Sequence, residues 1–422
     1  MEQKIYNEYV EILKEELIPA MGCTEPIAVA YAAAVAVQAL GEKPESVEVN
    51  VSANIIKNVK SVVVPCTGGL RGIGAAVCAG IVAGCPEKEL EILEEITGEQ
   101  KVEMKKMLDT MPMTIRESDK EYIFDIQIKA CAGGHSGYVE IAGFHTNVIC
   151  VKKDDEIIRE KAYEEQGSSC ATDRSLLTVE KIIEFADCVD VADVEEVLQR
   201  QIDYNWAIAE EGMTGNWGAA IGKTLMEAYG NSVHNRAKAM AAAGSDARMN
   251  GCELPVVINS GSGNQGMTTS LPVIVYAKEL NVSKEMMLRA LVVSNLITIH
   301  MKTGIGRLSA YCGAISAGCG AGAGICYLYG GRAYEISHVI VNAVAINSGV
   351  VCDGAKASCA AKIASAVEAG LLGLQMQKNG KQFYGGDGLV EKGVENTIRN
   401  IGELAKKGMR ETDKTIIQIM TR

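Results

Sequence analysis

An uncharged run of small residues constrains the fold of this chain more than any other feature. It reads LSAYCGAISAGCGAGAGICYLYGG and spans residues 308–331, between Arg307 and Arg332. The run is long enough to cross a bilayer as a helix. Most of its residues, however, are Gly, Ala, Ser or Cys, whose side chains gain little free energy on transfer into lipid. We therefore predict a buried helix that approaches its neighbours closely, and no membrane span.

The composition limits the classes of protein to which the chain can belong. Its 422 residues suffice for two or three domains with a substantial core. It has 53 acidic and 41 basic residues, and the net charge of -12 disfavours binding to nucleic acid or to anionic membranes. The N-terminal residues lack the apolar stretch of a signal peptide, and 14 cysteines without such a signal are expected to be reduced thiols, buried residues or metal ligands. We therefore expect a cytoplasmic protein.

The periodicity of apolar residues predicts an α+β fold. Helical spacing occurs at residues 2–17, and again from Thr24, a candidate N-cap, to about Gly41. Strand-like segments follow at residues 46–55, 121–131, 137–143 and 147–155. Between the strands, helices are predicted at residues 73–83 and 87–108, and the chain from about residue 176 onward is mainly helical.

These segments predict three parts. A mixed α/β unit, residues 46–175, is expected to be inserted between an N-terminal helical segment, residues 1–45, and a mainly helical domain, residues 176–422. The N-terminal segment is expected to pack on the C-terminal domain.

The glycine-rich stretch SGSGNQG, residues 260–266, follows the strand-like segment 255–259 and has the G-x-G-x-x-G order of a dinucleotide-binding turn. Such a turn needs a helix directly after it, and Pro272 leaves no room for that helix in register. Two interpretations remain open. The stretch is a tight turn between helices, or it is a loop whose backbone N–H groups and polar side chains bind a small carboxylate.

Five cysteines fall within a short C-terminal stretch, at positions 312, 319, 326, 352 and 359. The first three recur every seven residues, which places them on one face of a helix. No close C-x₂₋₄-C pair of a zinc site is present. Cys319 and Cys326 are best explained as buried small apolar residues, and the spacing alone leaves a metal or cluster site open.

Four motifs together resemble the L-cysteine desulfidases, which are relatives of the iron–sulfur L-serine dehydratases. They are GCTEP (22–26), SGSGNQG (260–266), YCGAISAGCGAGAG (311–324) and VVCDGAKASC (350–359). They span most of the chain and occur in the expected order. In the serine dehydratases the last two cysteines lie farther apart and a proline precedes the final one. Here they are seven residues apart without that proline, which favours the desulfidase branch.

The resemblance implies a [4Fe-4S] cluster held by Cys312, Cys352 and Cys359. Three ligands on four irons leave one iron open as a Lewis acid. The candidate substrate-binding residues are Thr24 and, in the donor-rich loop, Ser260, Ser262, Gly263, Asn264 and Gln265.

Cys23 is the candidate catalytic residue. It directly precedes a predicted helix, whose N-terminal dipole is expected to lower the pKa of its thiol. Two roles stay open, and one residue could serve both. Cys23 either completes the cluster in the resting state or takes the Cα proton of the substrate.

The expected reaction is α,β-elimination of L-cysteine to hydrogen sulfide, ammonia and pyruvate. Alternatives are an L-serine dehydratase at the same site, a pyridoxal-phosphate lyase that uses Lys302 or Lys356, and a non-enzymatic iron–sulfur sensor. We expect a small amino-acid substrate, no nucleic-acid or membrane partner, and a homo-oligomer, taken as a dimer.

Overall fold

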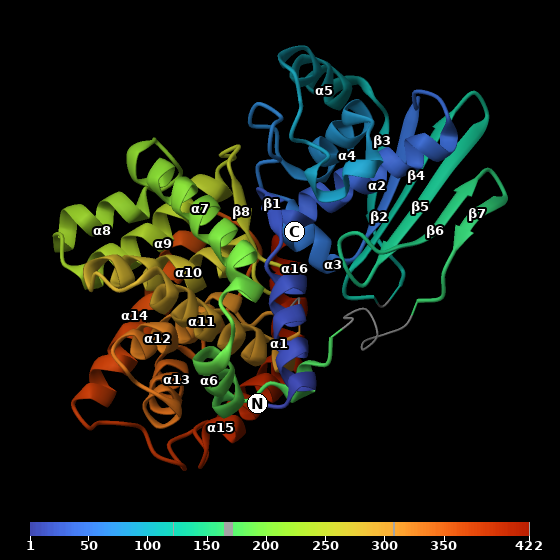
Figure 1. Ribbon diagram of the computed structural model, residues 1–422. Coiled ribbons are helices and arrows are strands. Elements are labelled where there is room, and N and C mark those ends of the chain that lie inside the picture. Colours follow the sequence, from blue (N-terminus) through green and yellow to red (C-terminus); the bar gives the residue numbers. More distant parts are fainter. Residues whose placement is uncertain (121, 164–171, 307–308, 422) are drawn as a thin grey trace.

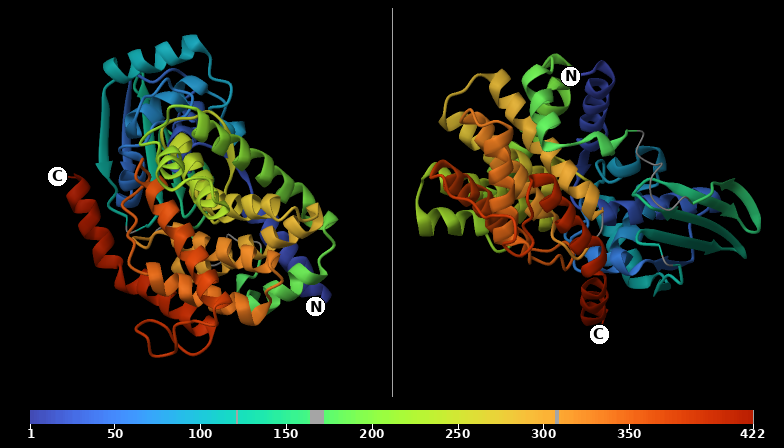
Figure 2. Two further views of the ribbon diagram at one scale, coloured as in Figure 1. Left: turned by 90° about the vertical axis from the view of Figure 1, so that its left-hand side faces the viewer. Right: turned by 90° about the horizontal axis from the view of Figure 1, so that it is seen from below.

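The computed structural model of the chain describes residues 1–120, 122–163, 172–306 and 309–421. Figure 1 shows a bundle of helices on one side and a β-sheet with covering helices on the other. The predicted α+β fold is confirmed, and the C-terminal region is mainly helical. Figure 2 shows the C-terminal helix extending from the body of the molecule.

The strands are β1 (Pro19–Met21), β2 (Ser46–Val51), β3 (Met113–Glu117), β4 (Asp125–Ala132), β5 (His135–Ala142), β6 (Val148–Lys153), β7 (Glu156–Glu160) and β8 (Pro255–Val257). The first helices are α1 (Gln3–Glu16), α2 (Thr24–Leu40), α3 (Ala53–Val59), α4 (Gly72–Ala83), α5 (Gly98–Thr110), α6 (Val179–Cys188), α7 (Ala192–Thr214) and α8 (Ile221–Tyr229). The remaining helices are α9 (Val233–Met249), α10 (Gly263–Glu279), α11 (Lys284–Ile305), α12 (Gly313–Leu328), α13 (Ala333–Asn347), α14 (Cys359–Lys378), α15 (Val394–Glu403) and α16 (Arg410–Thr421).

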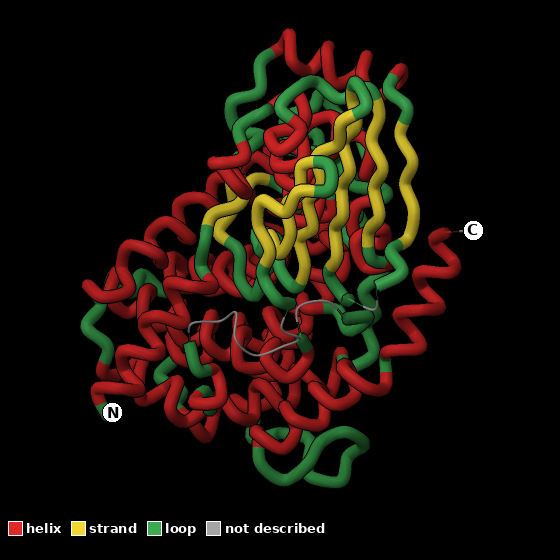
Figure 3. The backbone as a smooth tube through the Cα atoms, turned by 90° about the vertical axis from the view of Figure 1, so that its right-hand side faces the viewer, coloured by secondary structure: helices red, strands yellow, loops and turns green. Residues whose placement is uncertain are grey.

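Six strands form one sheet in the order β3-β2-β4-β5-β6-β7 (Figure 3). β2 and β3 are parallel, and the other neighbouring pairs are antiparallel. Alternate residues of β2, such as Val47 and Val49, are buried in a core that also contains α2 and α4. A second small sheet pairs β1 with β8 and so ties the N-terminal segment to the helical region.

The small-residue run forms α12, at the centre of the helical core. α12 packs against α10, α11, α13 and α14. A Cβ added to Gly320 would lie 2.2 Å from the Thr298 hydroxyl oxygen of α11, so only glycine permits this close approach. The predicted buried helix is therefore confirmed, although Arg307 and Leu308 lie outside the described residues. Within the described ranges, no helix is long and apolar enough to cross a membrane.

Two local predictions of secondary structure are wrong. The predicted strand at residues 46–55 ends at Val51, and α3 begins at Ala53. Residues 87–108 do not form one helix, because a short 3-10 helix covers Pro86–Glu91 and α5 begins only at Gly98. Thr97 and Gln100 form a capping box there, which favours a new helix start over continuation. β3 and β7 were also not predicted, since both edge strands are largely exposed and lack a clear apolar alternation.

Residues of the N-terminal segment pack in both of the main hydrophobic cores. Residues of α1 belong to the helical core, whereas residues of α2 belong to the core beneath the sheet. The domain bounds 1–45, 46–175 and 176–422 stay a prediction.

A buried carboxyl makes the stability of the helical region depend on pH. Asp246 of α9 is fully buried and accepts a hydrogen bond from the Gly222 N–H (3.0 Å) in the first turn of α8. Burial raises the pKa of Asp246 to about 6, above its ordinary value of about 3.9. A raised carboxyl pKa gives a contribution to stability that is complete below the unfolded pKa and is lost as the pH rises through the folded pKa.

We therefore expect Asp246→Asn, which keeps the acceptor oxygen without the charge, to reduce the fall in unfolding temperature between pH 5 and pH 7.5. Thermal unfolding of both proteins at the two pH values measures this. The same pH dependence in both would contradict the assignment.

Candidate active site

The structure brings three of the predicted cysteines to one end of the helical core. Cys312 lies directly before α12, Cys352 lies in the loop between α13 and α14, and Cys359 is the first residue of α14. A short antiparallel bridge joins the first two segments. The Cys312 N–H donates to the Val350 carbonyl (3.1 Å), and the Cys352 N–H donates to the Ala310 carbonyl (2.6 Å). Cys312 and Cys352 therefore lie on adjacent strands of backbone.

The packing of α12 on α14 brings the third cysteine close. A Cβ added to Gly318 would lie 2.3 Å from the Ala366 carbonyl oxygen, and one added to Gly322 would lie 2.8 Å from the Gly370 carbonyl oxygen. Both helices advance by four residues between these contacts, so they run in the same direction. Their N-termini, which carry two of the cysteines, therefore lie at the same end.

Cys23, from the N-terminal part of the chain, lies at the same end of the helical core, near Cys359. It directly precedes α2 and is 1% exposed. A small apolar cluster joins Cys23 to Val62 and Met249, with Cys359 packed against it. The N-cap of α2 is Cys23 and not, as predicted, Thr24.

The thiols are buried close to one another, and this controls their protonation. Burial raises the pKa of Cys23 to about 12, although the Arg248 guanidinium opposes the shift. Burial, and then the neighbouring Cys352, raises the pKa of Cys312 to about 12. Burial also raises the pKa of Cys359. The prediction that α2 would lower the pKa of Cys23 is wrong, because removing a thiolate from water costs more than the helix N-terminus offsets.

Three thiols at one end of the helical core have the donor chemistry of iron–sulfur cluster ligands. In the part of the chain that the structure describes, no three His, Cys, Asp or Glu side chains converge closely enough to hold one metal ion. A four-iron cluster spreads its ligands farther apart, because each thiolate binds a different iron. Cys312, Cys352 and Cys359 could each supply one thiolate, and metal binding would deprotonate them. The N-terminal ends of α12 and α14 favour the negative charge of such a group.

A buried guanidinium forms a second part of the site, at the start of α10. Arg248, near the end of α9, is 4% exposed, and its Nη1 donates to the side-chain oxygen of Asn264 (3.1 Å). Its Nε has no hydrogen-bond partner among the described residues. A Cβ added to Gly263 would lie 2.5 Å from that Nε, so the guanidinium lies directly over the first residue of α10. An unused guanidinium donor beside a helix N-terminus is suited to bind a carboxylate.

Gln265 lies between the start of α10 and the segment that holds Cys312. Its side chain is buried, and its Oε1 has no hydrogen-bond partner within the described ranges. A Cβ added to Gly313 would lie 2.6 Å from the Gln265 Cδ. Because Gly313 directly follows Cys312, the Gln265 amide lies against the segment that carries a candidate cluster ligand.

The glycine-rich stretch begins as a tight turn. Asn259 and Ser262 exchange two backbone hydrogen bonds of 3.1 Å. Between them, Ser260 and Gly261 have φ values of +51° and +79°, as a type I′ turn requires. The Thr24 hydroxyl oxygen lies 3.4 Å from the Gly261 carbonyl oxygen and 3.1 Å from a Glu25 carboxylate oxygen, which brings the N-terminal motif against the turn.

The expectation that Pro272 leaves no room for a helix after this turn is wrong, because α10 continues through it. Side-chain hydroxyls bind carbonyls near the proline. Ser270 donates to the Gly266 carbonyl (2.8 Å), and Ser294 donates to the Thr269 carbonyl (2.7 Å). A dinucleotide-binding unit is still not formed, since α10 is followed by α11 and not by a parallel strand.

The two lysines considered for a Schiff base lie in different settings. Lys356 forms an ion pair with Asp353 (3.2 Å), which also pairs with Lys362 (2.5 Å). These pairs stabilise the loop that carries Cys352. Lys302 lies in the last turn of α11 and is 5% exposed.

Sequence reasoning missed two residues of the site. Arg248 is one of them, and its only signal is a charge near the end of the alanine-rich segment of α9. Tyr311 is the other. Its hydroxyl is buried without a hydrogen-bond partner in the described part of the chain, directly before Cys312. Burial raises the pKa of Tyr311, so its hydroxyl stays a proton donor.

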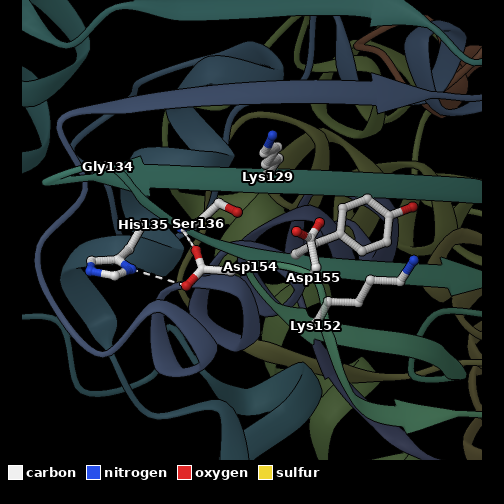
Figure 4. A pocket seen from close by; sticks show the side chains of 8 residues that line it. Lys129, Gly134, His135, Ser136, Lys152, Asp154 and Asp155 are labelled. Atoms are coloured by element: carbon white, nitrogen blue, oxygen red, sulfur yellow. Dashed lines mark hydrogen bonds and ion pairs between the residues drawn. The ribbon is translucent and has the colours of Figure 1, made fainter.

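A shallow pocket of about 630 Å³ lies elsewhere, on the sheet (Figure 4). Its lining residues are Lys129, Gly134, His135, Ser136, Tyr138, Lys152, Asp154 and Asp155. The His135 Nδ1 lies 3.0 Å from an Asp154 carboxylate oxygen. None of the predicted site residues lines this pocket.

Comparisons with known proteins place the chain in a family. The profile of the serine dehydratase alpha chain matches residues 87–418. A UPF0597 protein of Desulfitobacterium hafniense (strain Y51) is 59% identical over 419 residues, which cover 99% of this chain and 97% of the relative. UPF0597 proteins of Lachnoclostridium phytofermentans and Treponema denticola are 50% and 43% identical, and the alignments cover 99% and 100% of this chain and 100% and 99% of the relatives.

The matched range includes Cys312, Cys352 and Cys359 and leaves out Cys23. The match bears out the resemblance to the serine dehydratases and does not name a cysteine desulfidase. It indicates an enzyme with an amino-acid lyase-like function. Since the profile covers most of its length, the chain belongs to the serine dehydratase alpha chain family.

Proposed function

We propose that the protein is an iron–sulfur lyase that catalyses α,β-elimination of L-cysteine to hydrogen sulfide, ammonia and pyruvate. One observation carries the proposal. A buried guanidinium with an unused donor, at Arg248, is linked through the start of α10 to the segment that holds Cys312. Such an arrangement offers a carboxylate a place beside a set of metal-binding thiols.

In this proposal Cys312, Cys352 and Cys359 hold a [4Fe-4S] cluster. When bound, a cluster with three protein ligands supplies an open iron as a Lewis acid for the substrate or its leaving group. Arg248 orients the substrate carboxylate, and the buried side chain of Gln265 helps to exclude water from it. The low exposure of both residues strengthens these interactions, because they act in a medium of low dielectric.

Elimination also requires a group that takes the Cα proton. Cys23 is our candidate, since its thiol lies beside Arg248 and Cys359. Burial keeps this thiol protonated, so it must first lose its own proton, which the Arg248 guanidinium favours. The alternative role of Cys23 as a fourth cluster ligand in the resting state is compatible with the same position.

Dehydration of L-serine at the same site is the second candidate, and the family match favours it. Both reactions break the Cα–H bond and a bond at Cβ, and they differ in the leaving group. Anaerobic assays of sulfide release from L-cysteine and of pyruvate formation from L-serine separate them. A higher kcat/KM for L-cysteine supports the proposal, and turnover of L-serine alone would overturn it. A cluster-containing protein that converts neither amino acid would favour the alternative of an iron–sulfur sensor.

The carboxylate site leads to a kinetic prediction. We expect Arg248→Lys and Asn264→Ala each to raise KM by about 10-fold or more with a smaller change in kcat, because Arg248 contacts the carboxylate in both ground and transition states and Asn264 holds Arg248 in place. Arg236→Lys is the matched control. It lies on the same helix and pairs with Glu279 on the surface. Unchanged KM in both site variants, or tight binding of NAD to the wild-type protein, would contradict the carboxylate site.

A further inference from the structure

A chain of buried polar side chains ends at the glycine-rich turn. Its members are Gln201 of α7, Asn295 of α11, and Asn259 and Ser260 of the turn. The three amides are fully buried, and Ser260 is 7% exposed. Because buried hydrogen bonds must each join a donor to an acceptor, the direction of one bond constrains the direction of the next.

A backbone carbonyl fixes which group donates and which accepts in this series of hydrogen bonds. The Asn295 Nδ2 donates to the carbonyl of Leu291 (2.9 Å), which can only accept. The same Nδ2 donates to the Gln201 Oε1 (2.8 Å). The Asn295 Oδ1 therefore faces the other side, where it accepts from the Gln201 Nε2 (3.0 Å) and from the Asn259 Nδ2 (2.9 Å).

The bonds to Asn295 also fix the orientation of the Asn259 side-chain amide, which lies in the turn. Its Nδ2 also donates to the Asn295 carbonyl (3.3 Å), so both amide hydrogens are used. Rotating the amide would place its oxygen against two acceptors of Asn295. The Asn259 Oδ1 therefore faces Ser260 and accepts the hydrogen of its hydroxyl (2.8 Å).

The Ser260 oxygen is left with acceptor capacity only, since its single hydrogen is committed to Asn259. An acceptor-only oxygen repels a carboxylate and attracts a cationic N–H donor. We infer that Ser260 Oγ accepts a hydrogen bond from the α-ammonium group of an amino-acid substrate, whose carboxylate lies at Arg248. The inference rests on the proposed function and adds the group that selects amino acids over acids without an amino group. Gln201, Asn259 and Asn295 act as positioning residues for this acceptor.

The turn conformation allows a clean test. Ser260 has a φ of +51°, in the left-handed region that glycine adopts without strain, so Ser260→Gly removes the hydroxyl and spares the backbone. The probes are L-cysteine and 3-mercaptopropionate, which has the same carboxylate and thiol but no amino group. Ser337→Ala, on α13, is the control for loss of a serine hydroxyl elsewhere.

In the anaerobic holoenzyme we expect Ser260→Gly to raise KM for L-cysteine by about 10- to 100-fold, the range for a hydrogen bond to a charged group, with a smaller change in kcat. The inhibition constant of 3-mercaptopropionate should change less than about 2-fold, since that probe makes no ammonium contact. Equal weakening of both probes, or of neither, would overturn the inference alone. A cluster-containing wild-type protein that binds neither L-cysteine nor L-serine would overturn the proposed function as well.

Discussion

Replacing Cys352 with alanine is expected to abolish both the bound cluster and sulfide release. Cys352 lies beside Cys312 through paired backbone segments, and the hydrogen bonds that hold it there use its N–H and not its side chain. The loop should therefore keep its place while one of three thiolates is lost. Iron and acid-labile sulfide per chain, measured after anaerobic purification, test this together with the visible absorption spectrum.

The control for this experiment is another cysteine of the same region. Cys326 lies near the C-terminal end of α12, is 2% exposed and packs in the helical core. We expect Cys326→Ala to keep the iron content of the wild-type protein, because its thiol is far along the helix from the proposed ligands. A Cys352→Ala protein with normal iron content would show that the ligand set is wrong.

Replacing Cys23 with serine is expected to lower kcat by a factor on the order of 10²–10⁴, as for loss of a general base. Serine keeps the shape of the residue, but a hydroxyl in the same buried place loses its proton much less readily than a thiol, so it is a far poorer base. The iron content should stay at the wild-type value, since Cys312, Cys352 and Cys359 remain.

Cys66→Ser is the matched control, because Cys66 is also buried but packs beneath the sheet and not against Cys359. Two results would change the role of Cys23. Loss of the cluster in Cys23→Ser would make Cys23 an obligatory ligand and leave no open iron. Full activity with an intact cluster would make it a bystander.

The parts that sequence patterns predict well are those set by local periodicity. α1, α2 and α12 lie within one to five residues of the predicted bounds, because their apolar or small residues fit a helix without reference to the rest of the fold. The break before α5 and the continuation of α10 through Pro272 depend on capping side chains and on hydroxyls of a neighbouring helix. Such contacts have no strong local signature.

The residues of the candidate site also fall into those that sequence patterns predict and those that they do not. The cysteines belong to sequence motifs, so they could be identified as candidate site residues without a structure. Arg248 could not be identified as part of the site, because its meeting with Gly263 depends on how α9 packs against α10. The raised pKa of Cys23 follows from burial between distant segments, which outweighs the local helix dipole that the sequence makes visible.

The most direct test of the proposed function is the stoichiometry of products formed from L-cysteine by anaerobically reconstituted protein. We expect one sulfide and one pyruvate for each L-cysteine consumed, at a rate that rises with the iron bound per chain and vanishes when a chelator removes it. Equal turnover by iron-free protein, or no sulfide from protein with its full complement of iron, would contradict a cluster-dependent cysteine lyase.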